Sequence, residues 1–166
     1  MLPEAQVDRF LLKVLVTFPY EDVLDAVLEM TTGSGGSPVN QVLSGDPILE
    51  LQKLTREVPV ASHIRRAVAR FILATQPEDP TSSPEIRRNI RFGVSPRGGQ
   101  SLLLAAKGHA LLQGRYNVSP TDLEAMLAPA LRHRFQLSFE GQAEGTDAEK
   151  LLLDTFRRVA AEAVAA

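Results

Sequence analysis

Signals for the start of a helix recur in the second half of this chain, and they constrain its fold more than any other feature. Ser95-Pro96 and Ser119-Pro120 each place an N-cap residue before a proline, and Thr146-Asp147-Ala148-Glu149 is a further capping pattern. An N-cap side chain accepts a hydrogen bond from an unpaired backbone N–H, and proline suits the first helical position because it has no N–H to lose. Each of these sites therefore predicts the beginning of a helix.

Apolar periodicity extends this pattern along the chain. Helices are predicted over residues 21–30, 48–57 and 62–75, in a short segment from Pro84 to about Phe92, and in a main helix from about Pro96 to Gln113. By contrast, residues 10–16 are rich in β-formers and favour a buried strand that stops before Pro19. The sequence therefore predicts a mainly α fold, a bundle of six or more helices preceded by one orphan strand.

Composition narrows the classes of protein to which the chain can belong. A chain of 166 residues with a hydrophobic fraction of 44% can bury a sizeable core. Its net charge of −2 argues against bulk attraction to nucleic acid or to a membrane surface. It has no cysteine for disulfides or metal sites, and no apolar run of about 18 residues that would cross a membrane. We therefore expect a cytoplasmic chain with no membrane span and no nucleic-acid partner.

Arg97 is the least expected residue in this pattern, because it puts a cation on the first turn of the main helix. With Ser95 as N-cap and Pro96 as the first helical residue, Arg97 lies at the positive end of the helix macrodipole. A bound anion would reverse this penalty, since free N–H groups attract phosphate and the guanidinium adds a planar fork of donors. The alternative is a solvated arginine that points away from the helix end. The local sequence leaves both open.

Four segments together resemble the MoxR family of AAA+ ATPases, in the expected order. Ser95-Pro96-Arg97, between an apolar-Gly-apolar step and two glycines, is similar to the sensor 2 motif of that family. The run Leu-Pro-Glu-Ala-Gln-Val-Asp-Arg-Phe at residues 2–10 resembles its arginine-finger segment, which precedes the last strand of the nucleotide-binding core. Residues 131–134 and 139–145 resemble segments near the C-terminus of the family.

The resemblance implies a role for two arginines. Arg97, with Ser95 and Pro96, would form a nucleotide-binding sensor 2 that contacts the γ-phosphate held by its own subunit. Arg9 would be a catalytic arginine finger that acts in trans on the nucleotide of a neighbouring subunit. On spacing alone, an ion pair of Arg9 with Asp8 or Glu4 is the competing interpretation. The family uses ATP and Mg²⁺, forms homo-oligomeric rings and remodels client proteins, some of which contain von Willebrand factor A domains.

Two motifs of an ATPase are missing from the sequence. No G-x-x-x-x-G-K-[ST] loop occurs, and no apolar strand ends in Asp-Glu as a Walker B site would. The chain therefore resembles the C-terminal part of a MoxR-type ATPase, inactive alone and without tight ATP binding. We expect residues 1–31 to be a remnant of the AAA+ core with a connecting helix, residues 32–46 a flexible linker, and residues 47–166 the helical lid domain.

Other residue patterns allow competing interpretations. His63, His109 and His133 lack the spacing of a metal site. Basic clusters at residues 65–66 and 87–91 could contact nucleic acid, but aromatic residues are few and charge runs are usually solvated. The run at residues 132–134 is expected at the surface or at a contact between subunits. The remaining alternative is a non-enzymatic helical interaction module that keeps the shape of a lid.

Overall fold

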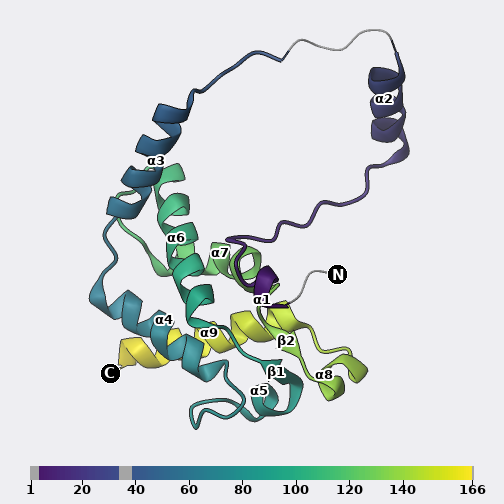
Figure 1. Cartoon of the computed structure of the whole chain (residues 1–166). Helices are drawn as coiled ribbons and strands as arrows, with labels where there is room; N and C mark the ends of the chain where they lie inside the picture. The colour runs from purple at the N-terminus through teal and green to yellow at the C-terminus, as the bar shows by residue number, and fades with distance from the viewer. Residues whose placement is uncertain (1–3, 34–38, 166) are drawn as a thin grey trace.

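The computed structural model describes residues 4–33 and 39–165, and these residues are mostly helical (Figure 1). In chain order the elements are α1 (Glu4–Val7), α2 (Glu21–Thr32), α3 (Gly45–Glu57), α4 (Ser62–Ala74), α5 (Pro84–Asn89), β1 (Ile90–Phe92), α6 (Pro96–Leu112), α7 (Pro120–Leu131), β2 (Gln136–Leu137), α8 (Phe139–Ala143) and α9 (Ala148–Ala165). The predicted mainly α fold is confirmed. Leu2 and Pro3 of the candidate finger segment and residues 34–38 of the predicted linker lie outside the described residues.

The predicted helix starts are confirmed, and each has its own cap. The Ser95 hydroxyl accepts a hydrogen bond from the Gly98 N–H at 3.2 Å, at the start of α6. At the start of α7, the Asp122 carboxylate accepts from the backbone N–H of Ser119 at 2.8 Å. At α9, one Asp147 oxygen accepts from two backbone N–H groups of the first turn. Local sequence alone determines these starts, because each cap uses groups only two or three residues apart.

The core lies where four helices meet. In Figure 1, α4, α6, α7 and α9 form the bundle, with α6 packed against α7 and α4 against α9. The predicted stripe on α4 is buried at Ile64, Val68 and Phe71, whereas Ile72 packs at the edge of the core. Phe71 meets Phe156 of α9 edge to face, with ring centroids 5.5 Å apart. This geometry is favoured because the positive edge of one ring faces the negative face of the other.

A small sheet and a short helix were not predicted. The helix opened by Pro84 ends at Asn89 rather than near Phe92, because Ile90 and Phe92 pair antiparallel with Leu137 and Gln136. That pairing joins residues more than forty positions apart, so no local sequence pattern predicts it. The helix α8 follows directly after the second strand.

The predicted buried strand at residues 10–16 is wrong. They run extended but form no sheet ladder, and their apolar side chains are largely exposed, with Val16 90% accessible. A strand is stabilised by its neighbours, and no described segment lies beside this one to pair with it. The predicted helix that follows, α2, does form, but none of its residues is buried and it stands apart from the bundle (Figure 1).

Among the residues that the structure describes, no helix is both long enough and apolar enough to cross a membrane.

Candidate functional site

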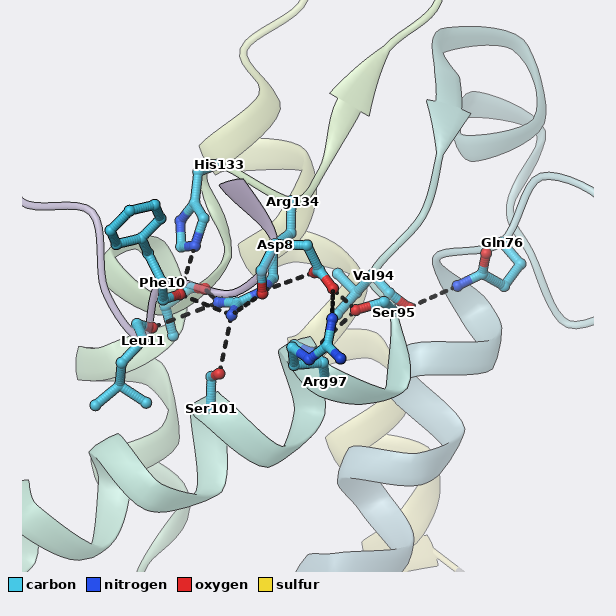
Figure 2. A network of polar contacts seen from close by, with 12 residues as sticks. Asp8, Phe10, Leu11, Gln76, Val94, Ser95, Arg97, Ser101, His133 and Arg134 are labelled. Atoms are coloured by element: carbon cyan, nitrogen blue, oxygen red, sulfur yellow. Dashed lines mark hydrogen bonds and ion pairs between the residues drawn. The ribbon is translucent and has the colours of Figure 1, made fainter. Parts of the chain in front are cut away.

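A polar network joins the N-terminal segment to the start of α6 and the end of α7. Figure 2 shows Asp8 between Ser95 and Arg97 on one side and Arg134 on the other. Asp8 and Arg134 are 126 positions apart, so the network closes only when the chain is folded. The three predicted nucleotide-binding residues, Ser95, Pro96 and Arg97, all lie at this point.

Close packing around the start of α6 requires two glycines. A Cβ on Gly93 would lie 2.4 Å from the backbone oxygen of Thr75, far inside normal contact. A Cβ on Gly98 would lie 2.6 Å from Val94 and 3.1 Å from the side chain of Arg134. The apolar-Gly-apolar step and the glycine after Arg97 therefore have a packing role, since they let α6 approach both α4 and Arg134.

Arg97 has an anionic partner. Its guanidinium donates to Asp8 Oδ2 at 3.0 Å, and its side chain is 52% exposed. Ser95 uses its hydroxyl twice, since it donates to Asp8 Oδ1 at 2.9 Å and accepts from the Gly98 N–H. A carboxylate thus occupies the position at the helix start where the sequence allows a bound anion. The opposed macrodipole and this half-exposed ion pair are each worth only about 0.3–1 kcal/mol, so they nearly cancel.

Asp8 is ionised at neutral pH. Partial burial alone would raise its pKa, but hydrogen bonds from Ser95, Arg134 and Arg97 outweigh burial and hold the pKa below its usual value. Three donors converge on one carboxyl group, and each stabilises the charged form. The site therefore presents two guanidinium groups and a hydroxyl to a single anion.

Arg134 corrects another expectation, because it is not a surface residue. Its side chain is 1% exposed, and its Nε donates to Asp8 Oδ1 at 3.0 Å. One terminal nitrogen donates to the backbone oxygens of Asp8 and Phe10, both at 2.7 Å, and to the Ser101 hydroxyl at 3.0 Å. A guanidinium can be buried when all its donors are satisfied. The neighbouring arginine Arg132 pairs with Glu149, so neither arginine of this run is free.

Arg9, the predicted arginine finger, does not join the network. Its side chain is exposed, and no hydrogen bond or ion pair links it to another side chain among the described residues. The ion pair with Asp8 that spacing suggested is not formed, because the Asp8 carboxylate is used by Ser95, Arg97 and Arg134. The side chain of Glu4, the other partner considered, is not among those described.

A cleft of about 580 Å³ lies beside this network. Asp8, Ser95 and Arg134 line it together with Gln76 and His133. Gln76 donates to the backbone oxygen of Val94 at 2.8 Å, which fixes the turn before α6. His133 lies within hydrogen-bond distance of the Phe10 oxygen, and burial lowers its pKa, so we assign a neutral ring that donates through Nε2. The network thus borders open space large enough for a small ligand.

Two of the other candidate residues have structural partners. His109 contacts the buried carboxylate of Asp122 at 2.7 Å, and Arg88 pairs with Glu144. Within residues 4–33 and 39–165, no group of three or more side chains is placed to hold a metal ion. The sequence suggests Asp8 only as an ion-pair partner of Arg9, and it places Arg134 on the surface or at a contact between subunits. The resemblance of their two segments to one family was the available signal.

A helical bundle with an arginine at the start of its central helix is the arrangement of an AAA lid domain. Comparisons with known proteins agree with this class. Residues 84–154 match the AAA lid domain. The chain is 31% identical to Chaperone MoxR1 of Mycobacterium tuberculosis over 160 residues, which are 96% of this chain and 42% of that protein. It is 35% identical to Protein MoxR of Paracoccus denitrificans over 148 residues, 82% of this chain and 44% of the relative.

A solved structure agrees with these relatives. The crystal structure of a candidate ATPase from Cytophaga hutchinsonii superposes with a TM-score of 0.82 at 25% identity, covering 95% of this chain and 48% of that one. The chain belongs to the MoxR family of AAA+ ATPases and corresponds to its C-terminal, lid-bearing part, which confirms the resemblance. It spans less than half the length of the curated relatives it matches.

Proposed function

We propose that this chain is the lid-bearing part of an ATP-hydrolysing, chaperone-like remodelling machine, in which Arg97 acts as sensor 2. In this role Arg97 contacts the γ-phosphate held by its own subunit, and Ser95 and Pro96 present it. The observation that supports the proposal is the Asp8 carboxylate bound by Ser95 and Arg97 at the start of α6. The start of α6 therefore already binds an anion, the carboxylate of a residue in the same chain.

A phosphate oxygen suits the same donors. The groups that hold Asp8 are a hydroxyl and two guanidinium groups, and guanidinium is the side-chain group best matched to phosphate geometry. Arg97 is the half-exposed member of the set, so it can turn toward a nucleotide without opening the core. Such contacts increase hydrolysis by positioning and by charge stabilisation rather than by covalent chemistry.

Family membership supports the rest of the proposal. Arg9 is exposed, as a residue that reaches a neighbouring subunit must be, and we assign it the arginine finger in trans. We assign residues 1–31 to the remnant of the core and its connecting helix, residues 32–46 to the linker and residues 47–166 to the lid. The assembled protein would be a cytoplasmic homo-oligomeric ring that uses ATP and Mg²⁺ and acts on client proteins, including proteins with von Willebrand factor A domains.

The proposal can be tested in a fusion of this chain with the nucleotide-binding part of a MoxR-type ATPase. In this joined protein, Arg97→Ala should lower ATP turnover and abolish the lid movement that distinguishes ATP from ADP. Loss of one charge-stabilising donor typically costs about 10²–10³-fold in turnover. Arg70→Ala is the control, because Arg70 is an exposed arginine on α4 that does not line the cleft and has no carboxylate partner among the described residues.

The same substitution in the chain by itself should change the free energy of unfolding by well under about 1 kcal/mol, because the ion pair and the macrodipole offset each other. Urea unfolding measures this. A clear loss of stability would make Arg97 a structural residue and would remove the basis of the proposal.

Calorimetry of the isolated chain with ATP and Mg²⁺ should show no tight binding. Charged hydrogen bonds contribute roughly 1.5–3 kcal/mol each, whereas micromolar affinity needs about 8.2 kcal/mol. The sequence holds no Walker A loop to supply the difference. A micromolar dissociation constant would contradict this expectation. Unchanged turnover in the joined Arg97→Ala protein would instead favour the alternative, a non-enzymatic helical interaction module.

A further inference from the structure

The segment that carries Arg9 is attached to the lid by one buried guanidinium. Residues 8–11 form neither helix nor sheet, so their backbone oxygens need donors from elsewhere in the molecule. Arg134 provides them, with hydrogen bonds to the backbone oxygens of Asp8, Phe10 and Leu11. Figure 2 shows this guanidinium lying between the segment and Ser101 of α6. Three backbone carbonyl groups of this irregular segment thus meet one planar fork of donors.

Two further contacts extend the attachment along the end of α7. The His133 ring nitrogen is 3.0 Å from the Phe10 oxygen, and the Lys13 N–H donates to the backbone oxygen of Pro129 at 2.8 Å. The last turn of a helix leaves carbonyl groups unpaired, which makes Pro129 available to an outside donor. The segment therefore lies along the C-terminal end of α7, and Arg9 lies between its attached residues.

The Asp8 carboxylate links this attachment to the start of α6. One oxygen accepts from Arg134 and Ser95, and the other accepts from Arg97. Asp8 is the residue directly before Arg9, so the backbone that carries the exposed arginine is fixed to the same elements that carry Arg97. A displacement of the lid would move both arginines together.

We propose that Arg134 is a positioning residue for Arg9, which docks residues 8–11 on the lid so that the lid sets the place of Arg9. The purpose of this docking, to aim Arg9 at a neighbouring nucleotide, rests on the proposed function. The docking itself does not, because it is defined by contacts within this chain. Because of this docking, the position of Arg9 depends on the lid and not on the extended segment that follows Arg9.

The absence of cysteine in the sequence allows a direct test. Spin labels on Arg9→Cys and Gln100→Cys, both exposed positions, report the distance between the segment and α6. In an otherwise unchanged chain we expect one narrow distance distribution. Arg134→Gln should broaden it and should speed hydrogen exchange at the Phe10 and Lys13 amides about 10-fold or more, with exchange within α6 unchanged. The control is Arg132→Gln, two residues away on the same turn and only 14% exposed.

The outcomes separate the proposal from a merely structural role. An unchanged distribution in folded Arg134→Gln would overturn the docking, and so would exchange that rises equally in α6 and in the segment. If Arg134→Gln does not fold, Arg134→Lys keeps the charge but not the fork, and a distribution as narrow as the parent's would then overturn the proposal. No nucleotide enters this experiment, so its failure would leave the role of Arg97 standing, and failure of the Arg97→Ala turnover test would leave the docking standing.

Discussion

Arg9→Ala should lower the ATP turnover of an assembled MoxR-type ring that contains this chain by about 10³-fold, with nucleotide affinity nearly unchanged. An arginine supplied in trans stabilises charge that develops on the transferred phosphoryl group, so its loss affects the transition state more than the bound ground state. The exposed side chain of Arg9 is consistent with this role, since it is not used by the Asp8 network. Steady-state turnover and equilibrium nucleotide binding measure the two effects separately.

Mixed rings supply the decisive comparison for Arg9. A subunit with a disabled Walker A site but an intact Arg9 should restore hydrolysis at the site of an adjacent Arg9→Ala subunit. Arg70→Ala, which changes an exposed arginine on α4, controls for the loss of a surface charge. If rings of both subunits form and hydrolysis does not return, Arg9 does not act in trans.

Asp122→Ala should destabilise the folded chain by about 2–3 kcal/mol, a large effect for a single polar side chain. The Asp122 side chain is fully buried, where it accepts from Arg115 at 2.7 Å and contacts His109 at 2.7 Å. It also closes the capping box at the start of α7 through the backbone N–H of Ser119. Its removal leaves two partners without their anion and the helix without its cap. Urea unfolding monitored by circular dichroism measures the loss.

Asp147→Ala is the control, because Asp147 also accepts from backbone N–H groups at a helix start, that of α9, but is exposed and has no ion pair among the described residues. It should cost only about 1 kcal/mol, the typical value of a helix cap. The difference between the two variants isolates the buried network. Equal losses would mean that Arg115 and His109 contribute nothing beyond the cap.

The same network predicts a dependence of stability on pH. Hydrogen bonds from Arg115, opposed by burial and aided by Ser119 and His109, hold the pKa of Asp122 well below its ordinary value. A depressed carboxyl pKa stabilises the fold fully above the unfolded value of about 3.9, and this contribution is lost as the pH falls toward the folded value. The stability advantage over Asp122→Asn should therefore be constant near neutral pH and shrink in acid. An advantage that persists unchanged below pH 3 would contradict the assignment.

Local patterns account for most of the helices. The cap and proline at Ser95-Pro96, or at Ser119-Pro120, act over two or three residues, so the sequence carries the whole signal. The apolar stripe of α4 likewise predicts which face is buried. Residues 10–16 were misjudged because β-formers predict a strand only where a neighbour exists to pair with it. The strands β1 and β2 were missed for the complementary reason, since each is too short to be recognised apart from its partner.

In the candidate site, too, some features are set by local sequence and others only by the fold. The sequence by itself determined that Ser95, Pro96 and Arg97 open a helix, that the chain has no Walker loop, and that its motifs resemble one ATPase family. Only the tertiary structure decided which anion Arg97 meets and that Arg134 is buried, because Asp8 comes within reach of both arginines only after the N-terminal segment has packed against the lid. Helix caps are set by neighbours in sequence, whereas the pairing of charges 126 positions apart depends on the fold that brings them into contact.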